Sequence, residues 1–159
     1  MWQWISAVPH DRNPLMDPTG KFCGEGQSDP NVFFLAGTLG GKAGRNDTCV
    51  VSSDKALFFP VLNIKSDIIR TGGFESIEGI KKFVNENQDA VAIVSAHINN
   101  VSIVNLPTLG AQSQFFNLTY PENYAQGIES GHTIAVSNGT WIMLKPLPLG
   151  YHIKTSRES

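Results

Sequence analysis

The glycine cluster after the apolar residues 32–36 is the first candidate for chemistry. The stretch VFFLAGTLGGKAGR, residues 32–45, holds Lys42 among glycines, as phosphate-binding loops do. Such a loop has a glycine five residues before its Gly-Lys pair and a hydroxyl residue directly after it. This chain has Ala36 and Ala43 at those positions. We therefore expect a turn between strands, and no nucleotide cofactor.

Histidines are the next candidates, because imidazole binds metals and transfers protons. None of the four is spaced from another as metal-binding pairs are, as in HxH or HxxxH: His10, His97, His132 and His152. We expect them on the surface or at strand ends, with no resident metal. His97 and His132 are kept as ligand-binding candidates, and their convergence with an acid in one pocket would instead favour an enzyme.

Nucleophiles and acids give weaker signals. The chain has no GxSxG sequence to present a serine nucleophile. Asp17, Glu25 and Asp29 crowd one loop, and a glycosidase would need two carboxylates across a cleft. Loop acids beside glycine more often form turns. We expect a non-catalytic protein, keep Glu25 and Asp29 as ligand-binding candidates, and retain a polysaccharide hydrolase or lyase as the alternative.

The two cysteines, Cys23 and Cys49, are either free thiols or a disulfide. Both lie in Gly- and Asp-rich loop sequence with 25 residues between them, and a disulfide closing such a loop contributes about 3 kcal/mol. The loop setting favours the disulfide. Four Asn-x-Ser/Thr sequences are candidates for glycosylation: Asn46, Asn100, Asn117 and Asn138.

Trp2 and Trp4 open the chain within MWQWISAV, which fits either a short helix or a strand. In a strand the two rings share one face and form a platform for sugar rings. The alternative is that both pack against the edge of the core. We keep both as ligand-binding candidates.

The remaining pattern is mainly that of β-strands. Residues 32–38 and 55–64 are apolar enough for central strands, and Pro60 predicts a bend or bulge in the second. Residues 76–88 predict the one helix, with Ser76 as N-cap. Turn signals at Asn99-Asn100 and Asn138-Gly139 predict two hairpins. The strands expected around these features are 48–53, 90–98, 101–106, 113–120, 132–137, 140–147 and 151–156.

Composition limits the class of protein. With 159 residues, 15 glycines and nine prolines, we expect a single domain, residues 1–159, folded as an all-β, jelly-roll-like sandwich of eight or nine strands. Residues 9–31 form a long loop in it and 157–159 a tail. The net charge of −2 predicts no nucleic-acid partner, and no apolar run is long enough for a membrane span.

Several phrases together resemble a family of secreted bacterial and archaeal proteins of unknown function. They are the opening WQW with DPTG and a cysteine, then FFLAGTLGG, KALFFPVLN and SNGTWIMLKPLPLG. The resemblance covers most of the chain except the helical middle, where IKSDIIRTGGFES replaces a longer cysteine-bearing insert. It implies an exported protein whose tryptophan-rich segment follows the cleavage site of a signal peptide, which this sequence would not include. It also implies a disulfide at the two cysteine positions.

We therefore expect a secreted or extracytoplasmic protein that acts as a binding or structural module. Its expected partner is a glycan or another surface protein. A further alternative is a subunit of an extracellular assembly that pairs through an open sheet edge.

Overall fold

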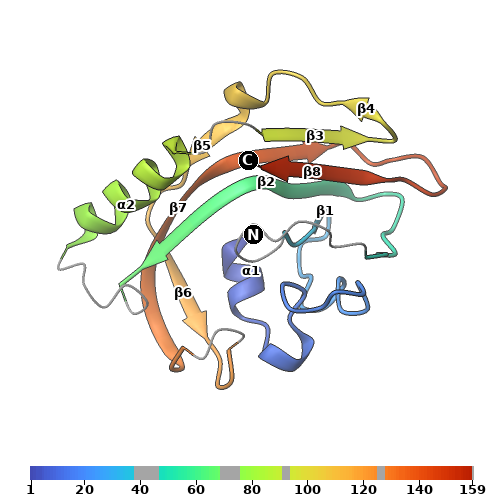
Figure 1. Cartoon of the computed structure of the whole chain (residues 1–159). Coiled ribbons are helices and arrows are strands. Elements are labelled where there is room, and N and C mark those ends of the chain that lie inside the picture. Colours follow the sequence, from blue (N-terminus) through green and yellow to red (C-terminus); the bar gives the residue numbers. More distant parts are fainter. Residues whose placement is uncertain (38–46, 69–75, 91–93, 125–127, 159) are drawn as a thin grey trace. The chain divides into compact units, whose positions relative to one another are not determined.

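A computed structural model describes residues 1–37, 47–68, 76–90, 94–124 and 128–158 (Figure 1). The described chain is mostly β, with eight strands in two sheets and two short α-helices, α1 (Trp2–Ser6) and α2 (Ile77–Asp89). Single 3-10 turns occur at His10–Arg12 and Leu106–Leu109. The strands are β1 (Val32–Phe34), β2 (Ala56–Asp67), β3 (Val94–Ile98), β4 (Val101–Ser102), β5 (Gly110–Gln112), β6 (Phe116–Tyr120), β7 (Gly131–Leu144) and β8 (Lys154–Glu158).

The strands pair in the orders β1-β2-β7-β5, with β6 also paired to β7, and β4-β3-β8. The chain divides into two compact units, through both of which β2 and β7 pass. The first unit comprises Met1–Phe59, Asn117–His132 and Met143–Pro148. The second comprises Pro60–Phe116, Thr133–Ile142 and Leu149–Ser159.

The core of the first unit forms around α1. Trp4, Ile5 and Val8 are buried there, with Leu15 and Phe34 packed against them. Strand β1 pairs in parallel with the start of β2, so that Phe34 lies opposite Phe58. The sequence allowed either a helix or a strand for the N-terminal segment, and the structure has the helix. This helix forms a hydrophobic core within the first unit.

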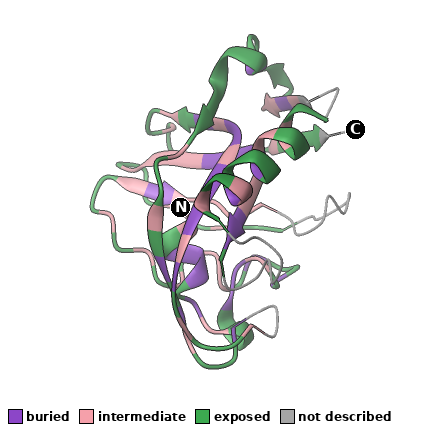
Figure 2. Cartoon of the chain, turned by 90° about the vertical axis from the view of Figure 1, so that its left-hand side faces the viewer, coloured by how far each residue is buried: buried purple, intermediate pink, exposed green. Residues whose placement is uncertain are grey.

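Helix α2 organises the second unit and confirms the helix predicted from sequence. The Ser76 hydroxyl accepts a hydrogen bond from the Gly79 amide at 3.1 Å, as an N-cap does. Ile80 and Val84 are its buried residues, and they pack with Val136 of β7. Figure 2 shows the rest of the helix as exposed or intermediate. Its amphipathic pattern therefore holds it on the sheet.

The hairpin predicted at Asn99-Asn100 is confirmed. The two asparagines have φ of 51° and 64°, the left-handed conformation that a two-residue hairpin turn requires. They join β3 to β4, and β8 pairs antiparallel with the other edge of β3. The last strand is thus confirmed with shifted bounds, 154–158 instead of 151–156.

The hairpin predicted at Asn138-Gly139 is wrong, because both residues lie inside the continuous strand β7. A Cβ atom at position 139 would stand 2.6 Å from the Leu62 carbonyl oxygen of β2. Glycine is therefore needed for close approach of two backbones, a role that it has in strands as well as in turns.

The strand predicted at 48–53 is also wrong, since residues 47–52 lie in no helix or strand. The Thr48 amide donates to the Thr19 carbonyl at 3.3 Å, and Cys49 is cross-linked to Cys23. The segment is thus bound to a loop, and its β-branched residues join no sheet. Most of the glycine cluster that resembles a phosphate loop, residues 38–46, lies outside the described residues.

Candidate functional site

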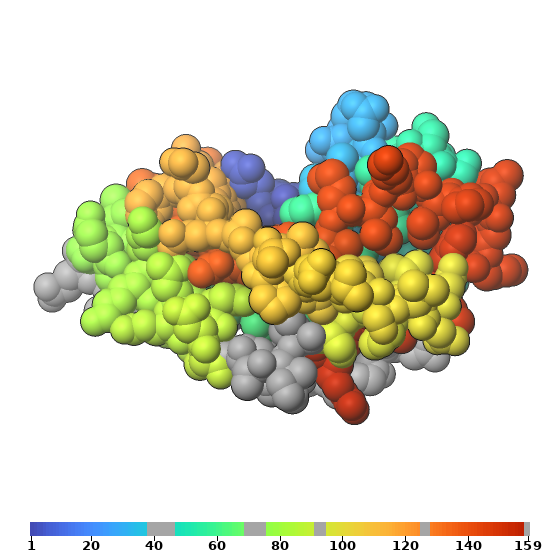
Figure 3. Space-filling model, turned by 90° about the horizontal axis from the view of Figure 1, so that it is seen from above, coloured from blue at the N-terminus to red at the C-terminus, as the bar shows by residue number. Residues whose placement is uncertain are grey.

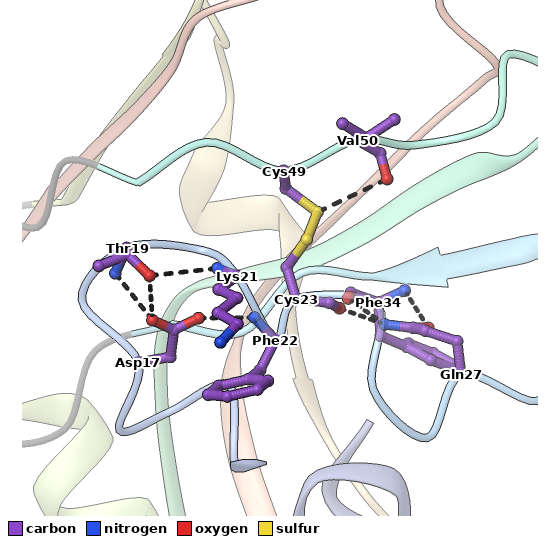
Figure 4. The surroundings of a disulfide bond; sticks show 9 residues. All are labelled: Asp17, Thr19, Lys21, Phe22, Cys23, Gln27, Phe34, Cys49 and Val50. Carbon is purple, nitrogen blue, oxygen red and sulfur yellow. Dashed lines mark hydrogen bonds between the residues drawn. A yellow bond between two sulfur atoms is a disulfide. The ribbon is translucent and has the colours of Figure 1, made fainter.

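The loop around the disulfide is held by its own polar groups (Figure 4). Cys23 and Cys49 form a disulfide, which confirms that prediction. The Asp17 carboxylate accepts hydrogen bonds from the amides of Thr19 and Phe22 at 2.9 and 2.7 Å. These contacts give Asp17 a structural role in the turn.

The side chain of Gln27 pairs with β1 as a neighbouring strand would. Its Nε2 donates to the Phe34 carbonyl at 2.8 Å, and its Oε1 accepts from the Phe34 amide at 3.1 Å. One amide side chain therefore satisfies both backbone groups of Phe34 on the side away from β2.

The two acidic candidates of this loop also have partners. Asp29 Oδ1 accepts from the amides of Asn31 and Val32 at 2.8 and 2.9 Å. These backbone hydrogen bonds, that from Asn31 first, hold the pKa of Asp29 below its usual value. Glu25 pairs with Arg12 at 3.1 Å. Such contacts suit turn formers better than a pair of catalytic acids.

Trp4 is 8% exposed and packs inside the first unit. Its ring stacks on Phe34 with centroids 5.7 Å apart, and its Nε1 donates to the Glu25 carbonyl at 2.7 Å. Trp2 precedes it by two residues on a helix, where such a spacing does not bring side chains to one face. Of the two alternatives that the sequence left open, Trp4 follows packing against the core and does not form an exposed platform.

The histidines are divided between the units. His132, in the first unit, lies with its Nδ1 3.0 Å from Thr119 Oγ1. His97 and His152 belong to the second, where Asn99 Nδ2 lies 2.9 Å from His152 Nδ1. Within the described parts of the chain, no three His, Cys, Asp or Glu side chains are grouped as metal ligands would be.

His97 lies next to hydroxyl residues on both neighbouring strands. It lies at the centre of the β4-β3-β8 sheet, directly opposite Ser102 of β4 and Thr155 of β8. Residues opposite each other in antiparallel strands project to the same face, with Cβ atoms about 5 Å apart. His97 is therefore flanked on both sides by hydroxyl residues.

The next row extends this polar face. Arg157 of β8 is opposite Ser95 of β3, and side chains two apart on a strand share a face. Ala96, which points to the other face, is 2% exposed. On the face of His97, Arg157 and Thr155 are exposed, whereas Ser95 and His97 are half-buried. We call the set Ser95, His97, Ser102, Thr155 and Arg157 the histidine face. In the described part of the structure, neither His97 nor Arg157 has a side-chain hydrogen bond or ion pair.

The residue Val101 of β4 and the segment that leads into β8 are apolar and highly exposed. The exposed fractions are 69% for Val101, 88% for Leu149, 100% for Tyr151 and 63% for Ile153. We call these four residues the apolar end. Figure 3 shows the hairpin segment, in yellow, beside the C-terminal segment, in red, on the face seen from above.

Local contacts fix the chain at the apolar end. Asn99 Oδ1 accepts from the Ile153 amide at 2.9 Å, and the Asn99 amide donates to the Ile153 carbonyl at 2.8 Å. Gly150 has φ of 140°, a conformation that other residues rarely adopt. The chain therefore turns at Gly150, exposes Tyr151 fully, and is held at Ile153 to the turn that follows β3.

The four sequons differ in accessibility. Asn138 Nδ2, the atom that would carry a glycan, donates to Asn85 Oδ1 of α2 at 2.9 Å. Asn100 and Asn117 are exposed, and Asn46 lies outside the described residues. The folded second unit thus offers Asn100 and not Asn138 for modification.

The sequence analysis identified His97 but missed Arg157 and Tyr151. Gly150 before Tyr151 was the available signal for the aromatic residue. Arg157 had none, because only the register of β8 on β3 brings it to the row beside His97. No helix in the described ranges is both long and apolar enough to cross a bilayer. Comparisons of the chain with protein families, curated proteins and solved structures found no match, so the resemblance to a secreted family stays a prediction.

Proposed function

We propose that this chain is a non-catalytic binding module that acts outside the cytoplasm and takes carbohydrate as its ligand. The binding surface is the histidine face together with Tyr151 of the apolar end. The jelly-roll-like arrangement of the strands belongs to the same proposal. The disulfide supports the location, because disulfides persist in oxidising compartments.

The observation that carries the proposal is the full exposure of Tyr151, three residues before β8, the strand that carries Thr155 and Arg157 of the histidine face. An aromatic ring offers an apolar surface with a polar tip, which suits the apolar side of a sugar ring. Ser102, Thr155 and Arg157 supply hydrogen-bonding groups for sugar hydroxyls. Few polar groups beside an apolar contact are typical of small-ligand sites.

A glycan array followed by titration of the best ligand tests this proposal. Tyr151→Ala should lower the affinity about tenfold, since aromatic anchors contribute more than about 1 kcal/mol, whereas Tyr151→Phe should retain most of it. Val50→Ala is the matched control, because Val50 is 90% exposed but lies in the first unit. Absence of binding to every glycan, or equal binding by Tyr151→Ala, would contradict the proposal.

A second candidate function is a subunit of a protein assembly. Several large exposed apolar residues in the second unit favour it, Val101, Leu149 and Tyr151, because exposed apolar surface often marks protein interfaces. Size-exclusion chromatography over a range of concentrations distinguishes the two: self-association that Leu149→Ser abolishes supports assembly, and a concentration-independent elution volume opposes a homomeric one.

A further inference from the structure

We infer that the histidine face binds the carboxylate of a uronic-acid polysaccharide, with Arg157 as the residue that holds the charge. This inference rests on the proposed function and adds the chemical class of the ligand. It depends on which charges the sheet carries and on the face to which each is directed.

The segments that build this sheet carry little negative charge. Residues 94–109 and 149–158 contain two cations, Lys154 and Arg157, and one acid, Glu158 at the end of β8. The whole chain has a net charge of −2, so the positive character is local to the sheet. A local positive field next to hydrogen-bond donors favours an anionic ligand.

The two cations point to opposite faces of β8. Arg157 shares the histidine face with Thr155, opposite Ser95. Lys154 is opposite Ile98 and shares the other face with Ser156, to whose Oγ its Nζ donates at 3.0 Å. Within the described residues Arg157 keeps its donors for a ligand, whereas Lys154 already uses one inside the protein.

The guanidinium group of Arg157 is suited to a planar carboxylate. A guanidinium group binds a carboxylate through two parallel hydrogen bonds. His97 and the hydroxyls of Ser102 and Thr155 extend the row of polar groups along the strands, one residue pair away from Arg157. From Lys154 to Glu158 strand β8 covers about 13 Å, which is long enough to contact several units of a polymer.

The test compares two polymers with one backbone. Polygalacturonate carries free carboxylates, and fully methyl-esterified polygalacturonate carries none. We expect the wild-type chain to bind the acid form at least tenfold more tightly by isothermal titration calorimetry. Arg157→Gln should lower that affinity about tenfold, because it removes the charged donor of the hydrogen bonds to the carboxylate.

Lys154→Gln is the matched control, because it removes the same charge from the same strand on the opposite face. It should change the affinity less than about twofold, given the low value of exposed charges. Equal losses in the two variants would show a diffuse charge effect and overturn the inference. Circular dichroism of each variant verifies that the sheet is retained.

The outcomes also separate the inference from the proposed function. Equal binding of the acid and the ester, with Tyr151 still required, would leave the carbohydrate module standing and refute the carboxylate site. Binding of neither polymer would refute the site as well. Equal binding of dextran sulfate or single-stranded DNA would show a general polyanion surface and would also refute it. Preference for the acid form that is lost only in Arg157→Gln supports it.

Discussion

Gly139 of β7 lies directly against Leu62 of β2, so that a Cβ atom at position 139 would stand 2.6 Å from the Leu62 carbonyl oxygen and 2.7 Å from the Asn63 Cβ. Both of those neighbours belong to a paired strand with little freedom to move. We expect Gly139→Ala to lower the free energy of unfolding by about 1–3 kcal/mol through overpacking, measured by urea denaturation.

Gly110→Ala is the control for this prediction. Gly110 has φ of −67°, and its nearest contact would be the Pro107 carbonyl oxygen at 3.6 Å. Alanine fits both the space and the backbone there, so stability should be retained. An unchanged urea midpoint in Gly139→Ala would mean that β2 and β7 are farther apart than the structure shows.

The same glycine shows where sequence reasoning succeeds and fails. The helix at 77–89 and the turn at Asn99-Asn100 were predictable, because a cap, an apolar face and positive-φ asparagines are local features. Asn138-Gly139 carries an equally strong local turn signal, yet the approach of Leu62, more than 70 residues earlier in the chain, keeps it in a strand. Tertiary packing overrides local preference in such cases.

The candidate site was also predictable only in part, because residue type is a local feature and strand register is not. His97 attracted attention by residue type, but its neighbours Ser102 and Thr155 follow from strand register. Thr155 is 58 residues away in sequence, and nothing in the pattern of 151–156 fixes which residue of β3 it faces. Trp4, in contrast, has a residue type that suggests binding, whereas its contacts with Phe34 and the Glu25 carbonyl make it part of the core.

Loss of the Cys23–Cys49 disulfide should destabilise the first unit. The two cysteines are 26 residues apart, for which chain entropy predicts about 3 kcal/mol. The double variant Cys23→Ser/Cys49→Ser should therefore unfold at a lower urea concentration. Wild-type protein in reducing agent should reproduce that midpoint, and a midpoint unaffected by either treatment would refute the prediction.

Gly20 should tolerate no side chain. It has φ of 80°, and a Cβ atom there would stand 2.2 Å from the Thr48 carbonyl oxygen. Gly20→Ala combines a left-handed backbone with a backbone clash, so we expect a loss of more than about 1 kcal/mol and a lower thermal midpoint. Gly24→Ala, four residues later with nothing within 4 Å of its added Cβ, should leave the midpoint unchanged. Similar midpoints for the two variants would contradict the contact between Gly20 and Thr48.

The Asp29 turn should make stability depend on pH in the acid range. Hydrogen bonds from the Asn31 and Val32 amides lower the pKa of Asp29 from its usual 3.8. A lowered pKa means that the ionised carboxylate stabilises the folded state. This stabilisation is complete when the pH is above the pKa of Asp29 in the unfolded chain, and it is lost as the pH falls through the pKa of Asp29 in the folded protein. The difference in thermal midpoint between wild type and Asp29→Ala should thus be constant from pH 7 to about 5 and shrink below about pH 4.

Asp29→Asn separates geometry from charge, because its amide oxygen can still accept hydrogen bonds from both backbone amides. Its thermal midpoint should lie between those of the two other proteins at neutral pH and depend less on acid pH. A wild-type advantage that grows as the pH falls would reverse the sign and exclude the ionised turn.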